Sequence, residues 1–339
     1  MDKYHFTQYA IPDRSFVAYI KREIHSLVSR AGFTAGRIGE IDIIVSELTS
    51  NLVKHAGGGD LFYRLLENSG VWTFEILGID KGRGIDNVTQ MMRDGASTTN
   101  TLGNGLGAMH RLSDLFQIYS QRGWGTIAYC KVLSKREEVI PKPKLVFDVK
   151  ALSVPIHGER VCGDGYYVKR LPHETRVFMG DGLGHGEKAH EAVETACASF
   201  AASTEGSPVD VIRTMHMAVK RTRGLVATVA ILDHSQKQWR ICGVGNISTR
   251  LYSGLLFKHY LAYNGIIGLN IPTTMQAFTL PAESNHTIIM SSDGLRTRWD
   301  LSKYVGFNRY DPTILAAILY KDFVRGTDDA SVLIGRVNI

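Results

Sequence analysis

Apolar residues recur every three to four positions in two stretches near the start of the chain. One covers residues 16–33, and the other covers residues 37–59, where Ile41, Leu48 and Leu52 fall on one face. This spacing is typical of amphipathic α-helices. The second stretch ends in consecutive glycines, which cap helices well because glycine adopts left-handed backbone angles at little cost. The pattern therefore predicts two helices.

The next part of the chain has shorter apolar runs. We predict strands at residues 60–66 and 71–79, a short helix near residues 109–116, and a final hairpin through residues 127–132. The expected first half is a set of helices packed on a mixed or antiparallel sheet.

Short apolar strands separated by turns dominate the second half. Strands are predicted at residues 176–181, 225–233, 238–245, 249–257, 286–293 and 330–337. Two helical stretches, residues 187–202 and 208–223, follow the glycine-rich sequence MGDGLGHG. The overall expectation is an α+β chain whose two halves differ.

A polar segment with two prolines, KREEVIPKPK, separates the halves at residues 135–144, between the strand-like runs IAYCKVLS and KLVFDVKALSV. This composition is typical of a linker, and 339 residues suffice for two domains with cores of their own. We therefore expect one domain at residues 1–134 and another at residues 145–339. No internal repeat relates them.

Composition narrows the functional classes. The chain is 44% apolar and 21% charged, as in soluble globular proteins. Its net charge of +6 is not gathered into a basic stripe, so nucleic acid is not an expected partner. No segment approaches the roughly 20 apolar residues that span a bilayer, and the four cysteines lack metal-site or disulfide spacing. We expect a cytoplasmic protein with reduced thiols and no membrane partner.

Polar residues in the first half suit a magnesium nucleotide. Glu47 and Asn51 lie one helical turn apart, offering a carboxylate for proton transfer and an amide oxygen for a hard ion, although such a pair alone also fits a solvated face. Asp80 ends a predicted strand and precedes two glycines. The later GNGLGA sequence spells a dinucleotide fingerprint, but no strand precedes it, so that interpretation is rejected.

The ordered segments ELTSN, DKGRG and GNGLGAMHRLSD resemble the GHKL (Bergerat) ATP-binding superfamily, and SELTSNLVKHAGGG is most similar to RsbT-type serine kinases. The resemblance covers residues 10–134 and implies an ATP-binding α/β sandwich. It implies Asn51 as the Mg²⁺ ligand, Glu47 as the base and Asp80 as the adenine-recognising residue. The remaining implied nucleotide-binding residues are Gly82, Gly84, Gly103, Gly105, Gly107 and Thr126.

Acidic residues of the second half lie next to predicted strands or, in VCGDGYY, in a comparable place beside glycine. They are Asp164, Asp181, Asp293, Asp328 and Asp329. A single aspartate at such a place is usually a turn residue, but several converging carboxylates require neutralising cations. Oxygen-only ligands suit Mg²⁺ or Mn²⁺ rather than zinc. His185 and His190 are five residues apart, so we expect surface or supporting positions for them.

The ordered sequences GD, GDGLGHG, SDG and DDAS resemble the SpoIIE family of metal-dependent serine/threonine protein phosphatases, and GVGNISTRL is similar to its RsbX branch. The resemblance covers residues 145–339 and implies a β-sandwich flanked by helices that holds two Mn²⁺ or Mg²⁺ ions. It implies that Asp181 bridges the ions and that Gly182 offers its carbonyl. Asp164, Asp293 and Asp328 complete the metal shells, with Asp328 preferred over Asp329. Cys162 departs from the serine or glycine usual before the first GD.

The sequence does not fit the chemistry of cysteine phosphatases. Cys130 and Arg136 have the C-x5-R spacing of cysteine phosphatases, but the segment between them lacks glycine and is predicted to be a strand.

The expected protein is a bifunctional regulator that phosphorylates and dephosphorylates a STAS-domain partner in a partner-switching pathway. Two alternatives remain. In one, the first half is an ATP-gated binding module without kinase activity. In the other, the nucleotide bound to the first half regulates the phosphatase.

Overall fold

A computed structural model describes residues 5–13, 16–68, 70–88, 105–135 and 145–338. The chain forms two compact units, Met1–Lys142 and Pro143–Ile339, each with its own core. Among the described residues, no helix is both long and apolar enough to cross a membrane.

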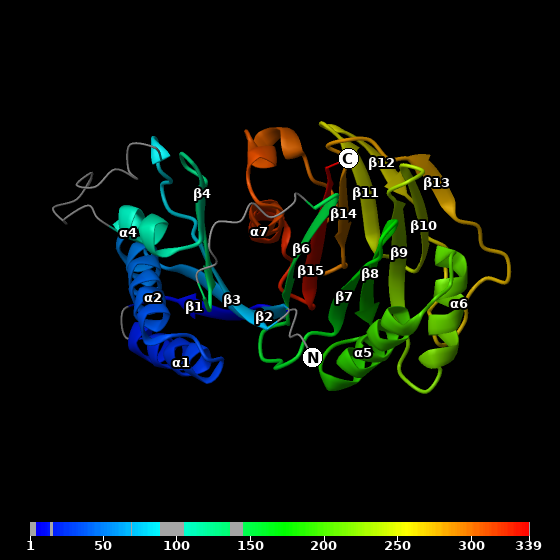
Figure 1. Cartoon of the computed structure of the whole chain (residues 1–339), viewed down its shortest axis with the longest axis horizontal. Helices are drawn as coiled ribbons and strands as arrows, with labels where there is room; N and C mark the ends of the chain where they lie inside the picture. Colours follow the sequence, from blue (N-terminus) through cyan, green and yellow to red (C-terminus); the bar gives the residue numbers. More distant parts are fainter. Residues whose placement is uncertain (1–4, 14–15, 69, 89–104, 136–144, 339) are drawn as a thin grey trace. The chain divides into compact units, whose positions relative to one another are not determined.

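The first unit is a five-stranded antiparallel sheet with helices on one side (Figure 1). Its strand order is β1-β2-β3-β5-β4. In chain order its elements are β1 (Thr7–Ile11), α1 (Val17–Arg30), α2 (Ala35–Ala56), β2 (Gly59–Asn68), β3 (Val71–Ile79), α4 (Gly105–Leu112), β4 (Leu115–Gln121) and β5 (Gly125–Leu133).

Helix α2 is defined at both ends by local chemistry. The side chain of Thr34 accepts a hydrogen bond from the Arg37 backbone N–H, and Gly57 ends the helix with φ of 70°. Ile41, Leu48 and other apolar residues of the helix are buried against the sheet. The two helices and the glycine cap predicted from the sequence are confirmed.

The second unit is a sandwich of two five-stranded sheets with helices outside (Figure 1). The strand orders are β13-β10-β9-β8-β7 and β12-β11-β14-β15-β6. The elements are β6 (Phe147–Val154), β7 (Asp164–Arg170), β8 (Glu174–Gly182), α5 (Glu187–Ala202), α6 (Pro208–Ala218), β9 (Leu225–Asp233), β10 (Gln238–Val244), β11 (Ser248–Ser253), β12 (Leu256–Tyr260), β13 (Phe278–Pro281), β14 (Thr287–Ser291), α7 (Pro312–Phe323) and β15 (Ala330–Val337).

Both sheets contribute to the core of this sandwich. Helices α5 and α6 bury their apolar faces on the first sheet, and α7 packs on β6 and β15 of the second. Phe147 of β6 and Trp239 of β10 meet edge to face between the sheets, with ring centroids 5.2 Å apart. The expected α+β class and helix-flanked sandwich are therefore confirmed.

Several expectations about individual elements are wrong. Residues 249–257 form parts of two strands joined by a turn rather than one strand, and the helix expected at residues 208–223 ends at Ala218. The helix expected near residues 109–116 begins earlier, at Gly105, and ends at Leu112 because β4 follows. Strands β1, β7 and β13 and helix α7 were not predicted. Helix α7 is buried on nearly all sides, so its sequence has no amphipathic period.

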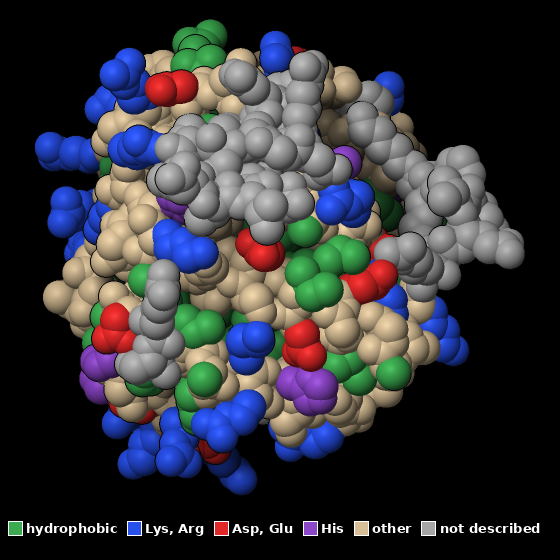
Figure 2. Space-filling view, turned by 90° about the vertical axis from the view of Figure 1, so that its left-hand side faces the viewer, with side chains coloured by type: hydrophobic (Ala, Val, Ile, Leu, Met, Phe, Trp, Pro, Cys, Tyr) green, Lys and Arg blue, Asp and Glu red, His purple; other side chains and the backbone are tan. Residues whose placement is uncertain are grey.

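The surface that faces the viewer in Figure 2 mixes charges of both signs. Lysine and arginine side chains are scattered across it, with acidic, histidine and apolar side chains between them. This view agrees with the modest net charge of +6.

Candidate active sites

The acidic cluster of the second unit is built on strand register. Strands β7 and β8 pair antiparallel, and Asp164 at the start of β7 lies directly opposite Asp181 near the end of β8. Residues directly opposite on antiparallel strands have Cβ atoms about 5 Å apart. Two carboxylates therefore stand side by side at one edge of the sheet.

The surroundings of Asp181 disfavour its ionised form. Burial, followed by the charges of Asp164, Asp293, Asp328 and Asp329, raises the pKa of Asp181 to about 10. Burial also raises the pKa of Asp164 to about 7, although a hydrogen bond from Ser292 opposes the shift. Like charges gathered in a buried place require a cation or protons to neutralise them.

Asp164 has an unused oxygen that points to a cation. Its Oδ2 accepts a hydrogen bond from Ser292 Oγ (2.6 Å), whose own oxygen accepts from the Ser331 backbone N–H (3.0 Å). Its Oδ1 is buried without a hydrogen-bond partner among the described residues. A buried carboxylate oxygen in this state costs free energy unless a further group binds it. The donor set fits a hard divalent ion.

Asp328 and Asp329 differ in what their oxygens do. Asp329 is buried, and its Oδ1 and Oδ2 accept hydrogen bonds from the backbone N–H groups of Ile156 and Gly163, both at 2.7 Å. Asp328 is half-buried and accepts from the Asp329 N–H through Oδ1 (2.9 Å). Asp329 thus ties two loops together, whereas Asp328 keeps an oxygen for a ligand.

Asp293 has a neighbour that the sequence interpretation missed. Asn246 donates from Nδ2 to Asp293 Oδ2 at 3.0 Å, from the turn between β10 and β11. The contact orients the carboxylate. Asn246 belongs to the segment GVGNISTRL, but an exposed asparagine beside glycine is ordinary for a turn, so no local pattern signals this role.

Close packing shapes the loop that follows Asp181. The Gly182 N–H donates to the Gly163 carbonyl at 3.0 Å. A side chain at Gly182 would lie within 3 Å of the backbone of Ala189 at the start of α5. His190 Nδ1 donates to the Cys162 carbonyl (2.9 Å), and His185 Nδ1 lies 2.8 Å from Glu159 Oε1. Both histidines therefore contact protein groups around the cluster.

In the described part of the chain, no group of three or more His, Cys, Asp or Glu side chains is placed closely enough to hold a metal ion. Magnesium usually binds through one or two carboxylates and keeps several waters. The looser grouping of acids here is compatible with ions of that kind.

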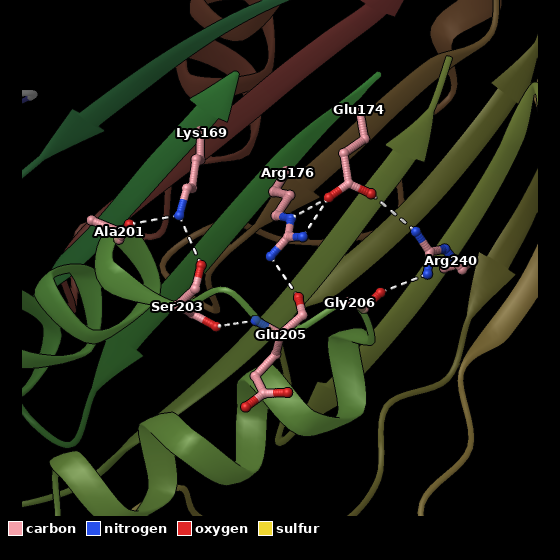
Figure 3. A network of polar contacts seen from close by, with 8 residues as sticks. All are labelled: Lys169, Glu174, Arg176, Ala201, Ser203, Glu205, Gly206 and Arg240. Carbon is pink, nitrogen blue, oxygen red and sulfur yellow. Dashed lines mark hydrogen bonds and ion pairs between the residues drawn. The ribbon is translucent and has the colours of Figure 1, made fainter. Parts of the chain in front are cut away.

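A network of charged residues holds the helical layer at the opposite end of β7 and β8 from the acidic cluster (Figure 3). Lys169 of β7 donates to the Ala201 and Ser203 carbonyls at the end of α5, both at 2.8 Å. Arg176 of β8 donates to the Glu205 carbonyl, and Arg240 of β10 to that of Gly206, each at 2.6 Å. Glu174 pairs with both arginines. Three strands thus hold the α5–α6 connection.

The predicted nucleotide residues of the first unit lie on α2, α4 and the end of β3. Glu47 and Asn51 are half-buried on α2. A Cβ at Gly105, the first residue of α4, would lie 2.6 Å from Glu47 Oε2. The absence of a side chain at Gly105 therefore lets Glu47 reach the N-terminus of α4, and Gly107 is buried in the same helix.

Asp80 is held rigidly at the end of β3. Its Oδ1 accepts hydrogen bonds from the backbone N–H groups of Gly82 (2.8 Å) and Thr126 (3.1 Å), and its own N–H donates to the Thr126 carbonyl (2.9 Å). The Thr126 hydroxyl lies 2.9 Å from that of Ser120. Gly84 has φ of 76° and packs on the Gln121 backbone. Gly103 lies outside the described residues.

His55 is a further polar residue near this site that the sequence interpretation missed. It lies one turn beyond Asn51 on α2. Burial lowers its pKa, the charges of Arg83 and Lys54 lower it further, and Asp80 opposes them. His55 and the basic side chains around it therefore lie near Asp80.

Cys130 has no nucleophilic character in this fold. It is fully buried within β5, and burial raises the pKa of its thiol to about 12. The thiolate needed for cysteine phosphatase chemistry is not formed at neutral pH. Arg136 lies outside the described residues.

Two family models match successive parts of the chain. The histidine kinase-like ATPase domain matches residues 13–129, and the stage II sporulation protein E (SpoIIE) family matches residues 172–338. The first match lies within the first structural unit, and the second lies within the second unit, of which it leaves out residues 143–171.

Two Bacillus subtilis (strain 168) proteins are similar to different parts of the chain. The serine/threonine-protein kinase RsbT is 33% identical over 101 residues, which are 30% of this chain and 76% of RsbT. The phosphoserine phosphatase RsbX is 28% identical over 142 residues, which are 41% of this chain and 69% of RsbX. The chain belongs to the RsbT family of histidine kinase-like ATPases through its first unit and joins that domain to a SpoIIE-family phosphatase domain.

Solved structures support the fold. One from work on the bacterial stressosome, a modular system adapted to control secondary messenger signalling, is 29% identical and has a TM-score of 0.53; the match covers 56% of this chain and 99% of that one. RsbX in complex with magnesium is 21% identical with a TM-score of 0.51, covering 58% of this chain and 98% of that one. The latter likeness concerns the fold alone.

Proposed function

We propose that the second unit is a metal-dependent phosphatase for phosphoserine or phosphothreonine in a protein. The observation that carries this proposal is the opposition of Asp164 and Asp181 at one sheet edge, with Asp293 and Asp328 close enough to raise the Asp181 pKa. When bound, two Mg²⁺ or Mn²⁺ ions would supply an activated water and neutralise charge on the phosphoryl oxygens. The SpoIIE match supports this class of chemistry.

The proposed roles of the chain's own residues follow from their contacts. Asp181, which stands opposite Asp164 on the neighbouring strand, would be the carboxylate shared by the two ions, and the Gly182 carbonyl would offer a further oxygen. Asp164 would bind through the oxygen that Ser292 leaves unused. Asp293, oriented by Asn246, and Asp328 would complete the site. Asp329 serves as a structural anchor because backbone amides occupy both of its oxygens.

For the first unit we propose ATP binding and transfer of the γ-phosphate to a protein serine or threonine. Asn51 would hold Mg²⁺, Glu47 would accept the hydroxyl proton, and Asp80, whose Oδ1 is fixed by two amides, would recognise the adenine amino group. The glycines of the first unit and Thr126 would shape the pocket. Similarity to RsbT supports this assignment.

The two activities would oppose each other on one partner. Similarity to a serine/threonine kinase and to a phosphoserine phosphatase, both from one organism, favours a phosphorylatable protein of the STAS class in a partner-switching pathway. The domains would span residues 1–134 and 145–339 with a linker at 135–144.

The first test is manganese-dependent phosphate release from an aryl phosphate and from phosphoserine proteins. The wild-type chain should release phosphate, and Asp181→Asn should not. Equal activity in the two proteins would refute the metal site. A wild-type chain that is inactive with saturating metal would refute the phosphatase assignment.

The kinase assignment has its own test. The wild-type chain should transfer the ATP γ-phosphate to a partner, and Glu47→Gln should bind ATP without transfer. Tight nucleotide-dependent partner binding without any transfer would instead identify an ATP-gated binding module. A response of phosphate release to added ATP would show that the nucleotide regulates the phosphatase, and a flat response would exclude this.

A further inference from the structure

An exposed arginine lies against the loop that follows Asp181. Arg223 Nη1 approaches the Leu183 carbonyl at 3.5 Å. The same nitrogen would lie 3.1 Å from a Cβ at Gly184, whose φ is 79°. The glycine therefore leaves room for the guanidinium to lie across the loop, two to three residues from Asp181.

The turn that carries Arg223 is fixed on both sides. The Thr222 hydroxyl donates to the Val219 carbonyl (2.8 Å) and accepts from the Gly224 N–H (3.1 Å). The Gly224 carbonyl accepts from the Leu183 N–H at 3.1 Å. Leu225, which follows, is the register partner of Gly182. The backbone that carries Arg223 is thus bonded directly to the loop that follows Asp181.

The guanidinium itself is largely uncommitted. An arginine offers five N–H donors, and within the described residues this one forms only the long contact to Leu183. The loop already has its own backbone bond from Leu183 to Gly224, so support of the loop does not require the side chain. An exposed guanidinium beside a phosphoryl-binding site is suited to charge-assisted bonds to phosphoryl oxygens.

We propose that Arg223 binds the phosphoryl group of the substrate at the phosphatase site. This inference rests on the proposed phosphatase function and adds a substrate-binding residue that is not a metal ligand. Arg221 is exposed two residues earlier on the same turn and carries the same charge. It does not contact the loop that follows Asp181, so it supplies a matched control.

The test compares the full wild-type chain with Arg223→Gln, Arg223→Lys and Arg221→Gln in saturating Mn²⁺. Calorimetry measures the affinity of each for inorganic phosphate, and kinetics give KM and kcat with an aryl phosphate and a phosphoserine peptide. Because a charge-assisted hydrogen bond is lost, Arg223→Gln should weaken phosphate binding and raise both KM values about tenfold. Arg223→Lys should recover part of the loss, and Arg221→Gln should stay within about twofold of wild type.

The outcomes separate this inference from the proposed function. Phosphate affinity and aryl phosphate KM that do not change in Arg223→Gln would overturn the inference, as would a KM effect seen only with the peptide. In both cases, loss of activity in Asp181→Asn would leave the phosphatase assignment standing. Wild-type binding of phosphate without any turnover would refute the phosphatase assignment while still testing Arg223.

Discussion

Asp164 and Asp181 are register partners on β7 and β8, so the pairing of the two strands forces two carboxylates to face each other. Opposite charges at directly facing positions stabilise the pairing of two strands, and like charges there destabilise it. The fold therefore maintains an arrangement that costs stability in the absence of metal, as binding sites commonly do.

Asp181→Asn should make the metal-free protein more stable. Because the pKa of Asp181 is raised to about 10 in the fold, from an unfolded value near 4, the folded state holds a proton that the unfolded state releases. Stability conferred by this group is therefore lost as pH rises from about 4 toward the folded pKa. The substitution should raise the free energy of unfolding only slightly at pH 4 and by on the order of 2 kcal/mol at pH 8. This gain is smaller than the full pKa shift of Asp181 would give, because the cluster relaxes.

Urea denaturation in the presence of a chelator at pH 4, 6 and 8 measures this gain. Asp210→Asn, on α6 with a side chain that is 48% exposed, is the control for a general effect of lost charge. Added Mn²⁺ should stabilise the wild type but not Asp181→Asn. A gain that is equal at all three pH values would show that titration of Asp181 does not cause it.

The apolar pattern reveals which residues end the strands but not how the strands pair. Asp181 and Asp293 follow clear apolar runs, so their places at strand ends were predictable. Asp164 begins β7, a strand whose polar and aromatic sequence lacks a clear period-two pattern, and β7 was not predicted. Register is a long-range property, so the opposition of Asp164 and Asp181 required the structure.

Local sequence also left the roles of adjacent acids unresolved. Asp328 and Asp329 occupy the same kind of position, and their difference arises from the distant backbone amides of Ile156 and Gly163. Helix α7 was missed for a different reason, because burial on nearly all sides removes the periodic signal. By contrast, α2 has an apolar stripe and a glycine cap, so its extent was predictable.

Substitution should separate the two adjacent acids by their effects. Asp329→Asn should destabilise the fold by about 2 kcal/mol, because one amide N–H would face the new NH₂ group instead of a carboxylate oxygen. Asp328→Asn should leave stability nearly unchanged, since its carbonyl still accepts from the Asp329 N–H, but should weaken Mn²⁺ binding. Urea denaturation and manganese titration measure the two effects. The reverse pattern would make Asp329 the ligand.

Asp80→Asn should fold normally yet bind ATP at least about tenfold more weakly, because losing a charged acceptor removes a hydrogen bond of that strength. The asparagine oxygen can keep the bonds from Gly82 and Thr126, which places the NH₂ group where the second carboxylate oxygen was. Nucleotide binding by calorimetry and the melting temperature without ATP give the two readouts. Equal ATP affinity in both proteins would remove Asp80 from the proposed adenine contact.

Asn51→Ala should also weaken ATP binding, and the loss should depend on magnesium. The substitution removes the amide oxygen proposed to hold the ion, so wild type and variant should differ in Mg²⁺ and converge in a chelator. A difference that persists without Mg²⁺ would indicate a structural role for Asn51 on α2.

Gly105→Ala should reduce phosphoryl transfer while sparing ATP binding. The new Cβ would fall 2.6 Å from Glu47 Oε2, so the flexible carboxylate must move away from the N-terminus of α4. Alanine favours a helix over glycine by about 1 kcal/mol, so the fold should not weaken. Gly39→Ala is the matched control, because Gly39 lies within α2 and a Cβ there would meet no other part of the described chain within 4 Å. Transfer should fall at least about tenfold in Gly105→Ala, less than the roughly 100- to 10,000-fold contribution of a well-placed general base because the flexible carboxylate is displaced rather than removed, and it should stay at the wild-type level in Gly39→Ala. Equal transfer in both variants would show that the position of Glu47 beside Gly105 is irrelevant to the reaction.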